Sequence, residues 1–231
     1  MSNAKFKTIF SINSEKNGFI KVVDSPSGRE LLTTSGAMLS CSENHKLLPD
    51  AYWGIFLKNI KKYRDNYKRA LIFGLGGGVI QNLLFKAYPG IEIVTIEYDP
   101  VMNDIYKYFF SGDKYENHKI LNVDAKSFAK NSHKFGDYEE YFDLVFVDTF
   151  SSFTTKEYDN FNNFYKDTKK FLKPNGMFAV NMIVWQDPTF NESLKFISSL
   201  SSFYKNTELI FVGSIAGNSN ILTYSSDKIN L

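Results

Sequence analysis

The fold of this chain can be predicted from residues 70–100, which read ALIFGLGGGVIQNLLFKAYPGIEIVTIEYDP. The apolar run at residues 70–73 is typical of a strand that is covered on both faces. A glycine-rich loop and an apolar stretch of helical period follow, and a second apolar run at 91–97 ends on Glu97. Two strands joined through a helix indicate a parallel pair, because such a crossover packs the helix onto one face of the sheet.

The alternation of strands and helices continues toward the C-terminus. Asp99 and Pro100 are expected to begin a helix, since Asp is a preferred N-cap and Pro fits the first turn. Further strands are expected at residues 119–124, 142–148 and 176–184, and further helices at residues 155–172 and near 190–200. Residues 208–213 and 220–225 read as a closing hairpin. The prediction is an α/β fold with a mostly parallel sheet and an antiparallel C-terminal edge hairpin.

The N-terminal part of the chain has a different pattern. Short strand-like segments separated by turn residues are expected at residues 6–12, 19–24, 29–33 and 36–40. From Pro49 the apolar residues recur at helical spacing. We therefore predict a small N-terminal β-strand domain at residues 1–48 and a nucleoside-binding Rossmann-like domain at residues 49–231.

Composition excludes several classes of protein. The 231 residues carry a formal net charge of +2, so no global field gathers nucleic acid or anionic lipid. No apolar stretch is long enough to span a membrane, and the N-terminus is too polar for the core of a secretory signal. The single Cys41 excludes an internal disulfide, and His45, His118 and His133 lack the paired spacing of metal ligands. We expect a cytoplasmic protein with no metal and no nucleic-acid or membrane partner.

Polar groups follow consecutive strands where ligands bind in an open α/β sheet, beyond the carboxyl ends of the strands. They are Gly74, Gly76, Gly77 and Gly78 after the first strand, Glu97 and Tyr98 after the second, Asp124 and Ala125 after the third, and Asp148 after the fourth. Each acid taken singly has a structural explanation, such as a helix cap. Together they favour a nucleoside-binding site, because four consecutive strands bring polar groups to one edge.

Each of these groups has a physical use at such a site. Glycines let the backbone approach a ligand closely and open a helix whose first N–H groups are free. Glu97 can accept hydrogen bonds from both hydroxyls of a ribose, and Asp124 can accept one from the exocyclic amine of adenine. Asp148 would lie nearest the reacting end, where it could deprotonate an amine or stabilise a sulfonium. Val79 breaks the dinucleotide fingerprint, so an adenosyl-sulfonium ligand explains the acids better.

The stretch at 70–100, together with NVDAKSF at 122–128, YFDLVFVDTFSS at 141–152 and FLKPNGMFAVN at 171–181, resembles the polyamine aminopropyltransferase (spermidine synthase) family. This resemblance implies the class I S-adenosylmethionine methyltransferase fold, preceded by a small β domain. It also implies a transferase of polyamine biosynthesis that moves an aminopropyl group from decarboxylated S-adenosylmethionine to a primary amine. A small-molecule amine is then the expected partner, and a homodimer is an expected assembly.

The resemblance also implies roles for individual residues. Glu97 would bind the ribose and Asp124 the adenine of decarboxylated S-adenosylmethionine or methylthioadenosine, beside the glycine loop, Tyr98 and Ala125. Asp148 matches the first acid of the family's D-[ST]-x-D-P motif, which orients and deprotonates the attacking amine. Thr149, Ser151 and Ser152 would form the substrate loop that follows it.

The chain departs from the family where the family holds its amines. Gly77 stands where the family has an Asp for the aminopropyl amine, and Ser151 and Ser152 replace the second acid and the proline of the motif. The family's Y-H-E segment corresponds to Tyr52-Trp53-Gly54, and its glutamine falls near Leu39. Nucleoside-holding positions are kept while diamine-holding positions are largely lost. Two alternatives therefore stay open: an S-adenosylmethionine-dependent methyltransferase, and a catalytically silent nucleoside-binding homologue.

Overall fold

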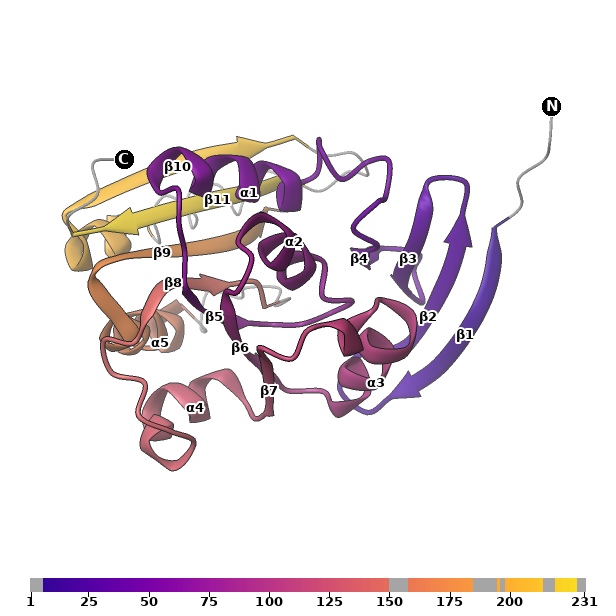
Figure 1. Ribbon diagram of the computed structural model, residues 1–231, viewed down its shortest axis with the longest axis horizontal. Helices are drawn as coiled ribbons and strands as arrows, with labels where there is room; N and C mark the ends of the chain where they lie inside the picture. Colours follow the sequence, from indigo (N-terminus) through magenta and orange to yellow (C-terminus); the bar gives the residue numbers. More distant parts are fainter. Residues whose placement is uncertain (1–5, 150–157, 185–194, 196–197, 214–218, 228–231) are drawn as a thin grey trace.

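The computed structural model describes residues 6–149, 158–184, 195, 198–213 and 219–227, and within them two sheets lie side by side (Figure 1). The small sheet contains β1 (Lys7–Ser14), β2 (Gly18–Ser25), β3 (Gly28–Thr33) and β4 (Met38–Cys41). The large sheet contains β5 (Arg69–Phe73), β6 (Glu92–Glu97), β7 (His118–Asn122), β8 (Phe142–Val147), β9 (Leu172–Val184), β10 (Asn206–Val212) and β11 (Ser219–Ser226).

The large sheet has the strand order β10-β11-β9-β8-β5-β6-β7. The pairs from β9 to β7 are all parallel, whereas β11 pairs antiparallel with both β9 and β10. Parallel strands need crossover helices, and the chain supplies one between each consecutive pair. The predicted parallel sheet with an antiparallel C-terminal edge hairpin is confirmed.

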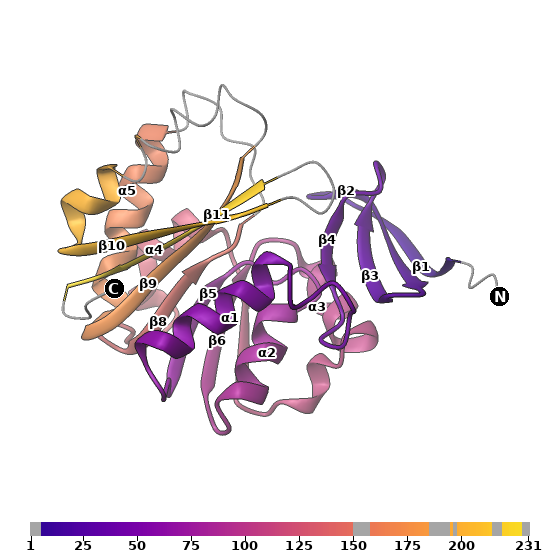
Figure 2. The ribbon, with the colours of Figure 1, turned by 90° about the horizontal axis from the view of Figure 1, so that it is seen from above.

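Helices cover both faces of the large sheet (Figure 2). Their bounds are α1 (Tyr52–Tyr63), α2 (Val79–Ala87), α3 (Pro100–Phe109), α4 (Ala125–Asn131) and α5 (Tyr158–Thr168), with short 3-10 turns at Gly112–Lys114, Ser132–Lys134 and Lys169–Phe171. Strand β5 shows why two layers are needed. Ala70 and Ile72 pack into the core under α1 and α2, while Leu71 and Phe73 pack into the core under α4 and α5. Successive side chains point to opposite faces, so an all-apolar strand requires cover on both.

The small antiparallel sheet packs against the large unit through α3. Ile20, Leu31 and Tyr106 belong to one buried cluster that joins β2 and β3 to α3. Arg29 adds a polar link, because its guanidinium donates a hydrogen bond to the carbonyl oxygen of Phe109 at 3.0 Å. The four N-terminal strands are confirmed, while the domain boundary at residue 48 stays a prediction.

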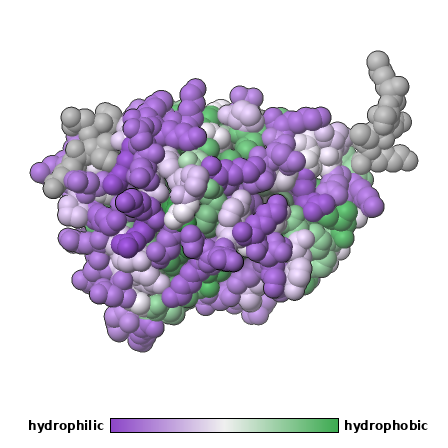
Figure 3. All heavy atoms as spheres, viewed as in Figure 1, coloured by the Kyte–Doolittle hydropathy of each residue, from purple (hydrophilic) through white to green (hydrophobic). Residues whose placement is uncertain are grey.

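The hydropathy of the molecular surface differs between the two sheets. Hydrophilic side chains cover most of the face shown in Figure 3, and apolar surface gathers over the small sheet. Among the described helices, none combines the length and apolar character needed to cross a membrane.

The structure corrects several element bounds. Helix α1 begins at Tyr52, shortly after Pro49, from which the helical spacing was predicted. Strand β7 ends at Asn122, and the unpredicted helix α4 starts soon after it. The helix predicted at 155–172 appears as α5 followed by a 3-10 turn, which gives it a shorter regular part. Of the helix near 190–200, residue 195 and residues 198–203 are described, and they are helical.

Gly78 is held in a conformation that a side chain would disrupt. Its φ is +71°, and a Cβ there would lie 2.0 Å from the buried ring of Tyr106. Gly90 has a similar φ of +82° but open space around it, so it provides a matched control. We expect Gly90→Ala to lower the free energy of unfolding by about 1–2 kcal/mol, and Gly78→Ala by more than about 3 kcal/mol. Urea unfolding of both variants measures this, and equal losses would contradict the steric argument.

Candidate functional site

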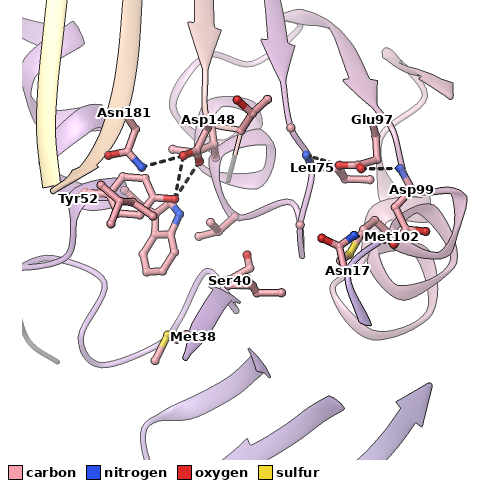
Figure 4. A pocket seen from close by; sticks show the side chains of 18 of the residues that line it. Asn17, Met38, Ser40, Tyr52, Leu75, Glu97, Asp99, Met102, Asp148 and Asn181 are labelled. Carbon is pink, nitrogen blue, oxygen red and sulfur yellow. Dashed lines mark hydrogen bonds between the residues drawn. The ribbon is translucent and has the colours of Figure 1, made fainter. Parts of the chain in front are cut away.

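The carboxyl ends of β5, β6 and β8 open into a cavity of about 850 Å³ whose opposite wall comes from β3 and β4 of the small sheet (Figure 4). The predicted site residues that line it are Gly74, Gly76, Glu97, Tyr98, Asp124, Ala125, Asp148 and Thr149. Gly77 and Gly78 are not among the lining residues. Ser151 and Ser152 lie outside the described residues. Side chains that are distant in sequence therefore meet around one space.

The glycines of the loop have different roles. Gly74 has a φ of +102°, and a Cβ there would lie 2.4 Å from the carbonyl oxygen of Asp148, so only glycine lets the loop after β5 approach the end of β8. Gly77 and Gly78 instead pack against the rings of Phe110 and Tyr106. Their part in ligand binding stays a prediction, whereas the structure shows a packing reason for both.

Glu97 anchors the glycine loop at the end of the cavity that β6 forms. One of its carboxylate oxygens accepts the N–H of Leu75 at 2.9 Å, and the other accepts the N–H of Asp99 at 2.8 Å. Burial raises the pKa of Glu97, and the backbone hydrogen bonds oppose this shift. Each carboxylate oxygen has a second lone pair, so these bonds leave acceptor capacity for a ligand hydroxyl.

Asp99 ties the small sheet to the same edge. Its side chain caps α3 by accepting the N–H of Val101 at 3.0 Å, as predicted for this helix start. The carboxylate also accepts hydrogen bonds from the hydroxyl of Ser14 and from the amide of Asn17, the latter at 2.6 Å. Tyr98, beside it, is 53% exposed at the cavity wall, with the ammonium of Lys16 over its ring.

Asp124 combines a structural role with a place on the cavity wall. Its side chain caps α4, since one carboxylate oxygen accepts the N–H of Ser127 at 2.8 Å. We predicted a cap at Asp99 but not here, because the short helix α4 has no clear apolar period. The cap leaves the other carboxylate oxygen outside this hydrogen bond, so the adenine contact stays a prediction.

Asp148 is the centre of a hydrogen-bonded group at the other end of the cavity. The hydroxyl of Tyr52 donates to both carboxylate oxygens, at 2.9 and 3.1 Å, and the amide of Asn181 donates to one of them at 2.9 Å. Asn220 in turn donates to the amide oxygen of Asn181 at 2.8 Å. Burial raises the pKa of Asp148 to about 6, although the bonds from Asn181 and Tyr52 lower it.

The sequence reasoning missed Asn181 and Asn220 and assigned Tyr52 no contact. A signal for Asn181 was present, because it is a polar residue inside the apolar strand GMFAVNMIV. No comparable signal marks Asn220, which reaches Asn181 through the antiparallel pairing of β11 with β9.

Ser40 lies between the two ends of the cavity. Its hydroxyl is buried without a hydrogen-bond partner, and it points into the space between Asp148 and the Leu75 loop (Figure 4). A Cβ at residue 77 would lie 3.0 Å from this hydroxyl oxygen and 3.2 Å from the ring of Phe110. A side chain at residue 77 would therefore need both neighbours to shift. Among the described residues, no three His, Cys, Asp or Glu side chains group as metal ligands.

Residues 56–229 match the protein family described as the spermine/spermidine synthase domain. The polyamine aminopropyltransferase of Vibrio vulnificus is 27% identical over 137 residues, which cover 59% of this chain and 45% of that protein. The probable polyamine aminopropyl transferase of Bifidobacterium longum is 25% identical over 159 residues, which cover 69% of this chain and 31% of that protein. The chain thus spans less than half the length of these two relatives.

Solved structures show the same fold. A spermidine synthase in complex with the transition state analogue AdoDATO matches 98% of this chain and 76% of its own, with a TM-score of 0.73 and 16% identity. Spermidine synthase from Thermotoga maritima matches 98% of this chain and 75% of its own chain, with a TM-score of 0.69 and 17% identity. Human methyltransferase-like protein 13 in complex with SAH matches 76% of this chain and 81% of its own chain, with a TM-score of 0.62 and 18% identity. The predicted methyltransferase-type fold with an N-terminal sheet is confirmed.

The raised pKa of Asp148, about 6, makes stability depend on pH. An unfolded Asp titrates near about 3.9, so the folded protein holds the proton more tightly. The protonated carboxyl group of Asp148 therefore contributes to the free energy of unfolding. This contribution is complete below about pH 3.9 and is lost as the pH rises through about 6. We expect the free energy of unfolding of the wild type, relative to Asp148→Asn, to fall across this window.

Urea unfolding at several pH values measures this difference. Asp104→Asn, measured in parallel, removes an exposed carboxylate that lies outside the cavity and provides the control. A difference for Asp148→Asn that does not change with pH would show that its carboxyl group titrates as in the unfolded chain.

Proposed function

The chain belongs to the spermine/spermidine synthase family, and we propose on this premise that it transfers an aminopropyl group from decarboxylated S-adenosylmethionine to a small amine. One observation carries the proposal. The cavity has the three predicted acids along its wall, with Glu97 beside the glycine loop and Asp148 at the opposite end. This arrangement suits a ligand with a nucleoside at one end and a reacting carbon at the other.

The donor fits the residues at the nucleoside end. Glu97 would accept the ribose hydroxyls, Asp124 the adenine amine, and Tyr98 and Ala125 would line the base. Gly74 and Gly76 line the cavity, so the loop backbone there would lie next to the bound donor. Ser40 lies farther along the cavity, with its hydroxyl oxygen buried in the wall.

Asp148 would accept the proton of the attacking amine. The amine nitrogen forms a bond to the aminopropyl carbon next to sulfur, the carbon–sulfur bond breaks, and its electron pair returns to sulfur, so that methylthioadenosine leaves. Tyr52 and Asn181 hold both carboxylate oxygens of Asp148 in a set orientation. A base with a pKa of about 6 is mostly deprotonated at neutral pH and still has appreciable proton affinity.

The test is release of methylthioadenosine from decarboxylated S-adenosylmethionine with a panel of primary amines. We expect Asp148→Asn to lower kcat/KM by roughly 100-fold or more, since general-base catalysis contributes about this factor. The wild-type kcat/KM should rise as the pH increases through about 6, because the carboxylate must be deprotonated to accept the proton.

Asp104→Asn should keep wild-type activity, because Asp104 is exposed and does not line the cavity. Calorimetry compares the decarboxylated and carboxylated donors. Tighter binding of S-adenosylmethionine together with methyl transfer would replace the proposal by a methyltransferase. No product with any amine and no binding of either donor would support a silent homologue.

A further inference from the structure

The end of the cavity beyond Asp148 has apolar walls. Ile183, Asn220 and Val212 lie side by side across β9, β11 and β10, because Asn220 pairs with both of the others. The indole of Trp53, next to the ring of Tyr52, faces the same cavity, and Met38 enters it from β4. With Asn181, which is hydrogen-bonded to Asn220, this end combines two amides with four apolar side chains.

Carboxylates are scarce at this end. Five of the described lining residues carry one: Glu30, Glu97, Asp99, Asp124 and Asp148. Glu97 and Asp99 hold the glycine loop and α3, and Asp124 caps α4. Glu30 accepts hydrogen bonds from Ser25 at 2.6 Å and from His45 at 3.1 Å, within the small sheet and the segment after it. Among the described residues, Asp148 is therefore the acid that belongs to the acceptor end.

From these walls we infer that the acceptor is an amine with a single ammonium group on an apolar body, not an aliphatic diamine. The inference rests on the proposed function. An amine held at Asp148 extends its remaining atoms toward Trp53, Ile183 and Val212. Among the described residues a second ammonium there would meet no further carboxylate, and losing its water without a counter-ion is strongly unfavourable. An apolar chain in the same place gains from burial.

Two amines of the same size test this directly. Pentylamine and diaminobutane differ only in a terminal methyl group against a terminal ammonium. With decarboxylated S-adenosylmethionine as donor, we expect kcat/KM for pentylamine to exceed that for diaminobutane by at least roughly tenfold. Methylthioadenosine release by the 231-residue chain at neutral pH is the readout.

A variant pair checks that the walls cause the preference. Ile183 is half-buried, so a longer polar side chain can be accommodated at the cavity wall. Ile183→Glu should reverse the preference toward diaminobutane, because it supplies a carboxylate for the second ammonium. Ile183→Gln has nearly the same shape without the charge and should not favour diaminobutane. Thermal melting of both variants confirms that each is folded.

The outcomes separate this inference from the proposed function. Faster turnover of diaminobutane by the wild type would overturn the inference and leave aminopropyl transfer supported. An unchanged preference in folded Ile183→Glu would overturn the assignment of the apolar wall to the acceptor. Absence of methylthioadenosine with every amine would overturn the proposed function, and the inference with it.

Discussion

The carboxylate of Glu97 is the interaction on which the geometry of the cavity depends. It is buried, and it holds the N–H groups of Leu75 and Asp99 together. Asp99 then binds Ser14 and Asn17, so a single chain of hydrogen bonds joins the glycine loop, the turn after β6 and the first hairpin of the small sheet. A buried charge is tolerated only with such partners. The two walls of the cavity are thereby kept in register.

The opposite end of the cavity is built in the same way around Asp148. Tyr52 comes from the start of α1, Asn181 from β9 and Asn220 from β11, and each contributes to one hydrogen-bonded group. The two ends differ in what surrounds them. At the Glu97 end backbone N–H groups satisfy the carboxylate, whereas at the Asp148 end side chains do so beside apolar walls. The two buried carboxylates of the cavity are therefore held by different kinds of donor.

The sequence predicted a large part of this site for a definite reason. Polar residues follow the carboxyl ends of consecutive strands, and parallel strands place those ends at one edge of the sheet. Glu97, Asp124 and Asp148 were found by this rule, and they line one cavity. The rule could not separate ligand contacts from caps, so the bond from Asp124 to Ser127 was not foreseen. It also grouped Gly77 and Gly78 with Gly74, although their neighbours are aromatic rings.

Apart from α4, the sequence by itself determined the order of strands and long helices, the parallel character of the central sheet and the acids at the strand ends. These follow from local period and from short-range turn chemistry. Only the tertiary structure decided what those acids meet. Tyr52 and Asn220 lie 96 and 39 residues from the partners that they contact, and no local pattern encodes such a pairing. Ser40 illustrates the same limit: its unpartnered hydroxyl becomes visible only when β4 is packed against the glycine loop.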